Sequence, residues 1–521
     1  MRQRNALPVS VRLLLMLPLV TCMSCQANHV TRTIAKPDKY FTLDSRSPYL
    51  KVHYNDGRIQ ILDDWKAYPA DGYLYGHGVM LDANRDVIST GYDTVRLASV
   101  ALLESNVVES GTIVPEMTVF TGLSLALSIY CLLTPKACFG SCPTFYAWDG
   151  SRYTLMAEGF SSSVLPTLEA NDIDALYTAV PRSRTFDLRM TNEAYETHLI
   201  RSADLLVCPR PPGGGRILHM SDGSLRQASL LMPPSRCTAP EGDVLKTLVS
   251  FDTLERLSYT DSNDLESKED IDLVFDASGT HHLGLTLGFR QTLLTTYLFY
   301  QGLAYLGDSA AAMLSRMQSH PDAYRGYLDP FGTIFGGIEV LAQDSSGTWH
   351  RAGSFYETGP IAHNVQTVAL PDEIAFNGHV RLRMTKGMWR LNYVALAALG
   401  PAVTPIRIKP SLVLKDSVAQ PDELAILQTG SGHVVSMPSD VRILRYDLPD
   451  AYGDLDLFLD ARGYYIEWMR QEWLAETDPA KAAMMFLFPH AFLRMEAPRF
   501  KSLESSLENS FWSSRYVRRD Q

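Results

Sequence analysis

Four carboxylates fall within the short stretch MAEGFSSSVLPTLEANDIDALY, namely Glu158, Glu169, Asp172 and Asp174. Two carboxyl groups can hydrolyse a glycosidic bond when they lie about 5–5.5 Å apart in a retaining enzyme, or roughly 6.5–9.5 Å apart in an inverting one. The Glu-x-x-Asp-x-Asp spacing would also suit calcium, although it lacks the Gly and distal Glu of an EF-hand. The competing expectation is a solvated loop in which Asp172 or Asp174 caps a helical turn.

Cys138 and Cys142 lie in the stretch PKACFGSCPTFYAWDG. Their spacing is C-x-x-x-C, whereas the redox motif is C-x-x-C. A zinc site would need two further nitrogen or sulfur ligands at set spacing, and no matching pair follows. We therefore predict a disulfide or two buried thiols, with no metal and no cofactor. Cys208 and Cys237 are a second candidate pair, in a connectivity that the sequence leaves open.

Three tryptophans lie in or beside expected hairpins: Trp148, Trp349 and Trp389. On an exposed strand face, such rings could stack against sugars. Burying a tryptophan removes roughly 150–250 Å² from water, so packing in the core is the competing expectation. We keep the three as candidate binding residues.

Several enzyme and ligand classes lack their sequence signatures in this chain. The nucleophile elbow G-x-S-x-G, the zinc motif H-E-x-x-H and both Gly-rich phosphate motifs are absent. His281 and His282 are adjacent, and neighbouring side chains of a strand point to opposite faces, so one metal is not expected to bind both. The net charge of −11, without a Lys/Arg stripe, argues against nucleic acid as a partner.

The start of the chain predicts export. A basic opening precedes the apolar run LLLMLPLV (13–20), which is too short to span a membrane. The sequence TCMSCQAN follows, and a Cys at this point resembles a bacterial lipoprotein signal. We expect acylation at Cys25, with Cys22 or an unlipidated cut as alternatives. A lipid on the N-terminus would anchor the chain to a membrane. We therefore predict an exported envelope lipoprotein, on the outer membrane and facing the periplasm or the surface.

Strands must position most of the candidate residues. Alternating apolar residues around Asp56-Gly57 and Asp149-Gly150 predict hairpins, the second with a type I′ turn. The stretches IEVLAQDSSGTWHRAG and HVRLRMTKGMWRLNYVALAAL predict two more, in the manner of a β-sandwich. Helices are expected from Gln291 onward, after Asp478 as an N-cap, and from Pro498, where an apolar stripe should dock on the domain.

The predicted fold class is mainly β (α+β), with a small SH3-like β-barrel, middle domains of β-sandwich type and a helical C-terminal tail. The charge-free segment 117–134 is marginally short for a membrane span, and we expect it to be buried, with a membrane contact as the alternative. The expected segments are a signal peptide (1–25), a polar tether (26–45), the small barrel (46–110), an apolar Cys-containing connector (111–142), a β-rich domain (143–270), a strand with helices (271–330), a β-sandwich unit (331–410) and strands with the helical tail (411–521).

The stretch PKACFGSCPTFYAWDGSRYTLMAEGF, followed by TNEAYETHLIRSADLLV (191–207), resembles a module of exported bacterial proteins, lipoproteins included, whose biochemistry is unassigned. In that module a Cys-Pro-x-x-Tyr-x-Trp-Asp-Gly hairpin precedes an Asn-Glu-x-x-Glu-Thr strand pair. It is similar also to modules appended to secreted tetratricopeptide and propeller-like repeat proteins. The resemblance implies location and architecture, and it carries no catalytic residue to this chain.

These observations favour a non-enzymatic binding or scaffold protein whose partner is a glycan or an envelope protein. The first alternative is an envelope polysaccharide hydrolase that uses the paired carboxylates. The second is a subunit of an envelope assembly, in which 117–134 packs against a membrane partner.

Overall fold

The computed structural model divides the chain into two compact units, residues 1–123 and 124–521. Strands hold 50% of the residues and helices 19%, which confirms the mainly β fold class. The structure describes residues 28–110 and 142–513, apart from 36, 48, 55–57, 69–71, 82–86, 165, 193–195, 212, 253, 277–281, 308–329, 357–358, 437–439, 450–453 and 468–475.

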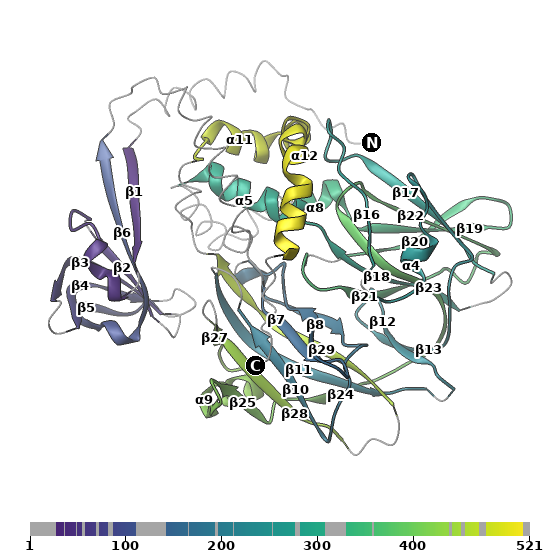
Figure 1. Cartoon of the computed structure of the whole chain (residues 1–521), viewed down its shortest axis with the longest axis horizontal. Coiled ribbons are helices and arrows are strands. Elements are labelled where there is room, and N and C mark those ends of the chain that lie inside the picture. The colour runs from purple at the N-terminus through teal and green to yellow at the C-terminus, as the bar shows by residue number, and fades with distance from the viewer. Residues whose placement is uncertain are drawn as a thin grey trace, which may run out of the picture. The chain divides into compact units, whose positions relative to one another are not determined.

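The first unit is one antiparallel sheet, sheet A, with strand order β1-β6-β2-β3-β4-β5 (Figure 1). The sheet is curled, and Leu50, Leu62 and Leu103 are fully buried on its inner side. Gly78 permits part of this curl, because a Cβ there would lie 1.8 Å from the carbonyl oxygen of Ile61. The elements of this unit are β1 (Asn28–Ala35), η1 (Pro37–Thr42), β2 (Tyr49–Tyr54), β3 (Ile59–Tyr68), β4 (Tyr73–Leu81), β5 (Val87–Arg96), η2 (Leu97–Ser99) and β6 (Val100–Ser110).

The segment 26–45 does not form the tether that we predicted. Residues 28–35 form β1, which pairs with β6 along its whole length, and η1 follows. The polar composition misled the prediction, because an edge strand needs apolar residues on one face only. The predicted signal peptide and most of the connector, 117–134 included, lie outside the described residues.

In the second unit, sheets B and C pack face to face as one β-sandwich. Phe145, Leu188 and Leu444 of sheet B meet Leu205 and Leu459 of sheet C in one buried cluster. Sheet B has the order β26-β25-β28-β10-β7-β8, and sheet C has the order β24-β11-β29-β9 with β27 also paired to β11. Their strands are β7 (Thr144–Trp148), β8 (Tyr153–Glu158), β9 (Ala170–Ala175), β10 (Thr185–Thr191), β11 (Glu196–Pro209), β24 (Ile406–Ile408), β25 (Leu412–Lys415), β26 (Val418–Ala419), β27 (Val434–Ser436), β28 (Val441–Asp447) and β29 (Leu455–Glu467).

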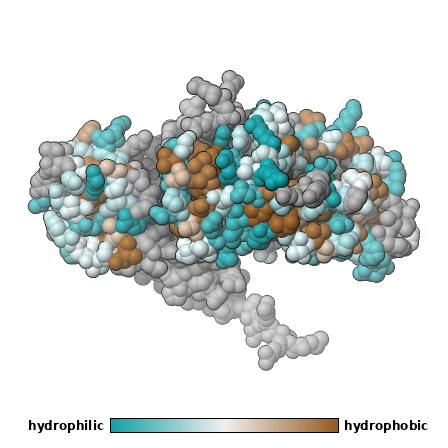
Figure 2. Space-filling view, turned by 90° about the horizontal axis from the view of Figure 1, so that it is seen from below, coloured by the Kyte–Doolittle hydropathy of each residue, from teal (hydrophilic) through white to brown (hydrophobic). Residues whose placement is uncertain are grey.

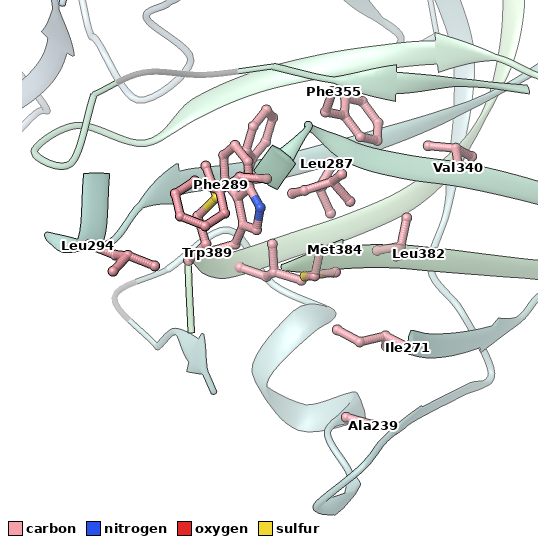
Figure 3. Close-up of a cluster of buried hydrophobic side chains, with 14 of the residues drawn as sticks. Ala239, Ile271, Leu287, Phe289, Leu294, Val340, Phe355, Leu382, Met384 and Trp389 are labelled. Carbon is pink, nitrogen blue, oxygen red and sulfur yellow. The ribbon is translucent and has the colours of Figure 1, made fainter. Parts of the chain in front are cut away.

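Sheets D and E form a second sandwich around the largest cluster of buried side chains. Figure 3 shows Trp389 and Phe289 beside one another there, with Leu382 and Met384 nearby. Sheet D has the order β12-β13-β23-β18-β21 with β16 on β23, and sheet E has the order β15-β14-β17-β22-β19-β20. Their strands are β12 (Arg216–His219), β13 (Leu225–Met232), β14 (Arg236–Ala239), β15 (Gly242–Asp243), β16 (Arg256–Leu257), β17 (Lys268–Val274), β18 (Leu283–Gln291), β19 (Ile338–Asp344), β20 (Trp349–Phe355), β21 (Asn364–Ala369), β22 (Phe376–Thr385) and β23 (Trp389–Ala402).

The two sandwiches are in contact, because sheet C packs against sheet D as well as against sheet B. Leu206 and Phe458 of sheet C contact Ile217 and Val365 of sheet D in a smaller buried cluster. Successive residues of β11 therefore enter different cores: Leu205 faces sheet B, whereas Leu206 faces sheet D. This explains why ADLLVC is an almost unbroken apolar run instead of an alternating one.

Helices close one end of the second sandwich (Figure 1). Asp478 caps the first turn of α11 by accepting a hydrogen bond from Lys481 N, as predicted. Pro498 does not open a helix: it lies inside α12, which begins at Pro489, and its ring is exposed. The helices are η3 (Pro166–Leu168), α4 (Leu245–Leu248), α5 (Leu294–Leu306), α8 (Pro330–Phe335), α9 (Pro421–Thr429), α11 (Pro479–Leu487) and α12 (Pro489–Ser513).

The predicted segments between 143 and 521 do not follow the sheets. Sheet B joins strands from 143–270 to strands from 411–521, and sheet D joins strands from 143–270, 271–330 and 331–410. The predicted hairpin at Asp149-Gly150 is present as β7 and β8, but its turn is not type I′. A type I′ turn requires a positive φ at both central positions. Gly150 has φ +101°, but Asp149 does not have a positive φ.

Candidate functional site

The four candidate carboxylates occupy separate positions on sheets B and C. Glu158 ends β8, is only 4% exposed, and accepts hydrogen bonds from the amides of Ile361 (2.7 Å) and Ala362 (3.3 Å). These amides belong to the connection between β20 and β21, so the hydrogen bonds of Glu158 link the first sandwich to the second. Gly359 belongs to the same contact, because a Cβ there would lie 2.5 Å from a Glu158 oxygen.

Glu169 precedes β9 and is surrounded by cationic groups. Both oxygens accept hydrogen bonds from Arg201, Arg462 lies 3.2 Å away, and His433 lies 3.6 Å away. Burial alone would raise the pKa of Glu169, but the hydrogen bonds and charge of Arg201, with the charges of His433 and Arg462, lower it overall. A general acid needs the opposite shift, because it must hold a proton near neutral pH.

Asp172 and Asp174 share one face of β9, two residues apart. Asp172 accepts a hydrogen bond from the Phe160 amide at 2.8 Å, and Asp174 is 3% exposed opposite Leu459. Among the residues that the structure describes, no hydrogen bond or ion pair joins two of the four carboxylates. The hydrogen bonds of Glu158, Glu169 and Asp172 therefore go to separate backbone amides and arginines.

A different pair of acids meets across sheet C. Asp204 of β11 lies directly opposite Asp460 of β29, and Arg407 of β24 bridges them at 2.9 and 2.6 Å. Asp460 also accepts a hydrogen bond from Asn171 at 2.8 Å. The sequence signal was an acid that interrupts each apolar run, in SADLLV and LFLDAR. One guanidinium holds both carboxylates, which is the geometry of an interstrand clamp.

Neither a metal centre nor a reactive thiol emerges within the described ranges. No group of three or more His, Cys, Asp or Glu side chains there could hold a metal ion. Cys208 of β11 and Cys237 of β14 are free thiols in separate cores, so the prediction that they pair is wrong. Burial, with the charges of Asp456 and Asp243 respectively, raises the pKa of each thiol to about 12, so both stay protonated.

The remaining site candidates that involve cysteine or histidine are only partly described. Cys142 is buried. Cys22, Cys25, Cys138 and His281 lie outside the described residues, so lipidation and the partner of Cys142 stay predictions. His282 is exposed and pairs with Asp372 at 2.9 Å.

The three candidate tryptophans separate into one core residue and two surface residues. Trp389 is 2% exposed between Phe289 and the rest of the second core, so it is not a binding residue (Figure 3). Trp349 lies on the outer face of sheet E, beneath the guanidinium of Arg381 at 4.7 Å. Trp148 lies on the outer face of sheet B, since its neighbours Phe145 and Ala147 point into the core.

We name Trp148, Tyr153, Arg182 and Arg189 the arginine–aromatic cluster. The Trp148 and Tyr153 rings, opposite one another in the hairpin, meet edge to face at 5.9 Å. The Arg182 guanidinium lies 3.1 Å from the centre of the Trp148 ring, and that of Arg189 lies 4.6 Å from the centre of the Tyr153 ring. The alternation of FDLRM, whose Phe, Leu and Met are buried, turns Arg189 outward, so sequence could have found this half of the cluster.

The backbone holds the other half of the cluster in place. The amide of Val180 donates to the carbonyl of Trp148 at 2.7 Å, which lays the segment before Arg182 along the end of β7. The turn of the hairpin also lies beside this segment, because a Cβ at Gly150 would lie 3.8 Å from a methyl group of Val180. The Val180 hydrogen bond therefore brings Arg182, two residues later, to the Trp148 ring.

Comparisons with known proteins assign no family. No family model matches the chain, and no curated protein matches it. Among solved structures, the arabinofuranosyltransferase AftD from Mycobacteria, determined by cryo-EM, matches with 10% identity and a TM-score of 0.17. The match covers 86% of this chain and 32% of that protein, so the chain spans about a third of its length. A TM-score this low does not establish a common fold.

Apolar groups are not gathered in one continuous area on the surface seen in Figure 2. Hydrophobic side chains form several separate patches there, divided by hydrophilic ones. No helix in the described part of the chain has the length and apolarity needed to cross a membrane.

Proposed function

We propose that this chain is an exported, lipid-anchored cell-envelope protein that binds a glycan partner and does not transform it. The observation that carries the proposal is the arginine–aromatic cluster, an outward-facing set of rings and guanidinium groups on a rigid sandwich. Aromatic faces and planar guanidinium groups are suited to sugar rings and their polar substituents.

The arrangement of the acids supports binding over hydrolysis. Glu169 is held by arginines and has a lowered pKa, while Glu158 and Asp172 accept hydrogen bonds from backbone amides. Such contacts favour the ionised form of a carboxylate and position it structurally. Asp204 and Asp460 are bridged by Arg407, so both carboxylates are engaged in an interstrand ion pair.

The test is to incubate the full chain with a panel of purified envelope polysaccharides and measure both binding and release of reducing ends. We expect binding without release, and Glu169→Gln or Asp172→Asn should leave binding intact. Release of reducing ends that is lost in either variant would overturn the proposal in favour of the hydrolase. Intact-mass analysis would test the anchor, which requires cleavage before Cys25 or Cys22 and an added lipid mass.

A further inference from the structure

The cluster places two guanidinium groups over two aromatic rings on one sheet face. Arg182 is exposed, and in the described part of the chain no carboxylate pairs with it. From this geometry we propose that the arginine–aromatic cluster is a site for an acidic polysaccharide, whose sugar carboxylates bind Arg182 beside the Trp148 and Tyr153 rings. This inference rests on the proposed binding function and specifies the class of its ligand.

Stacking preorganises Arg182 for binding. An arginine side chain that is free in solution loses conformational entropy when a ligand immobilises it. Arg182 over Trp148 has lost part of that freedom already. Because a stacked guanidinium keeps its N–H groups at the ring's edge, it can still donate two parallel hydrogen bonds to a carboxylate.

The basic side chains around the cluster favour an anion, although the whole chain carries −11. Arg152 is exposed in the turn that leads to Tyr153, and Arg184 is exposed in the loop that leads to Arg189. With Arg182 they place three exposed guanidinium groups at this end of sheet B. A ligand that carries carboxylates would be attracted to these groups over a short range.

The acids nearest the cluster already have partners. Asp187 makes a two-point ion pair with Arg445 at 2.8 Å, and Asp149 accepts hydrogen bonds from amides within its own turn. The hydrogen bonds and charge of Asp187, with the charge of Asp447 opposite Thr185, raise the pKa of Arg445. Arg445 therefore neutralises Asp187, and no described carboxylate forms an ion pair with Arg182.

A polysaccharide fits this surface better than an anionic membrane does. The positive groups are few, Arg182 lies over a ring instead of extending freely, and the net charge of the chain is negative. Membrane adsorption depends on many basic groups at once, whereas a sugar acid needs one or two oriented donors beside an aromatic face.

The experiment measures dissociation constants of the full chain by calorimetry with polygalacturonate and with its methyl ester, which has the same rings without charge. We expect the ester to bind at least about tenfold more weakly, and Arg182→Ala to weaken polygalacturonate binding about tenfold, since a hydrogen bond to a charged group is typically that strong. Arg182→Lys should lose nearly as much, because lysine keeps the charge but not the planar stack. Arg236→Ala, which removes an exposed arginine from β14, is the matched control and should bind as the unaltered chain does.

Three results would overturn the assignment. Equal affinity for the acid and its ester would remove the carboxylate from recognition, while the binding function itself would survive. Full affinity in Arg182→Lys and Arg182→Ala would place the site elsewhere. Binding to phosphatidylglycerol vesicles that depends on Arg182, without binding to polygalacturonate, would make a lipid surface the ligand. Circular dichroism and thermal unfolding would establish that each variant is folded.

Discussion

The outer faces of sheets B and E each carry an arginine over a tryptophan, but the two arginines differ in their other contacts. On each, an arginine lies over a tryptophan: Arg182 over Trp148 on sheet B, and Arg381 over Trp349 on sheet E. On sheet E the arginine also makes a two-point ion pair with Asp272, the residue directly opposite in the neighbouring strand. On sheet B the arginine comes from a loop, and its contact is the ring.

The rest of sheet E continues this matching of charges. Arg383 pairs with Asp270 at 2.9 Å, and Arg351 pairs with Glu339 at 2.9 Å, all on the same outer face. The comparison teaches that an exposed Trp–Arg stack is not by itself a binding site. What distinguishes sheet B is that, among the residues that the structure describes, no hydrogen bond or ion pair engages the Arg182 guanidinium.

The largest expected effect separates the buried tryptophan from the two exposed ones. Trp389→Ala should lower the free energy of unfolding by about 3–5 kcal/mol, because it leaves a cavity among Phe289, Phe355 and their neighbours. Trp148→Ala and Trp349→Ala should each cost no more than about 1 kcal/mol, as expected for surface positions. Urea denaturation measures all three, and a loss of similar size at Trp148 would mean that the cluster is structural.

The interior between the sandwiches should respond to acid where the outer faces do not. His219 of β12 is 8% exposed, and burial lowers its pKa to about 4 despite the charges of Asp222 and Asp460. In the unfolded chain His219 takes up a proton below about pH 6.5, while in the folded chain its ring stays neutral down to about pH 4. Stability is therefore full above about pH 6.5 and falls toward pH 4, by at most about 3 kcal/mol.

The measurement for His219 is the free energy of unfolding between about pH 7.5 and 4 for the unaltered chain and for His219→Gln. We expect the variant to lose the part of the pH dependence that His219 contributes, while His433, whose pKa is also lowered by burial and by Arg201, keeps its own part. His282→Gln is the control, because His282 is 72% exposed and its removal should leave the slope unchanged. A slope that survives in His219→Gln would contradict the prediction.

Converting sheet E into a copy of sheet B would sharpen the comparison. The double variant Asp270→Asn and Asp272→Asn removes the carboxylates that occupy Arg383 and Arg381. We expect it to gain affinity for polygalacturonate of about five- to tenfold at sheet E, or about 1 kcal/mol. Calorimetry on a background of Arg182→Ala isolates this gain, and adding Arg381→Ala should abolish it.

The smallest expected effect concerns the ion pairs of sheet E. Arg383 is 46% exposed and Asp270 is 32% exposed, so water and salt screen the pair. Arg383→Ala should change the free energy of unfolding by less than about 1 kcal/mol. A loss of several kcal/mol in urea denaturation would contradict this expectation and show that the ion pairs hold sheet E together.

Local features of the fold could be predicted from the sequence, and long-range pairing could not. The hairpin of β7 and β8 and the helix cap at Asp478 follow from residues within a few positions of each other. Asp204 and Asp460 are 256 positions apart, and no local pattern states that they are opposite neighbours. Their strands were recognisable, but the register that joins them depends on the whole sandwich.

The candidate site was predictable to the same extent. Trp148 could be selected as an aromatic residue of a hairpin, while Trp349 and Trp389 were selected for the same reason with different outcomes. Burial of Trp389 depends on sheet D facing sheet E, which is a property of three-dimensional packing. Arg182 could not be selected, because its place over the Trp148 ring depends on the backbone hydrogen bond from Val180.

The strands that flank β11 have a consequence for how the chain matures. Its hydrogen-bonded neighbours β24, β27 and β29 all begin at or after Ile406, about 200 positions later. During synthesis β11 is therefore made long before its partner strands, and the backbone N–H and C=O groups of both its edges stay unpaired. Such unpaired edges can pair with strands of other chains. The order in which segments are synthesised therefore differs from the order in which they fold. Any factor that shields nascent strands would act on β11 first.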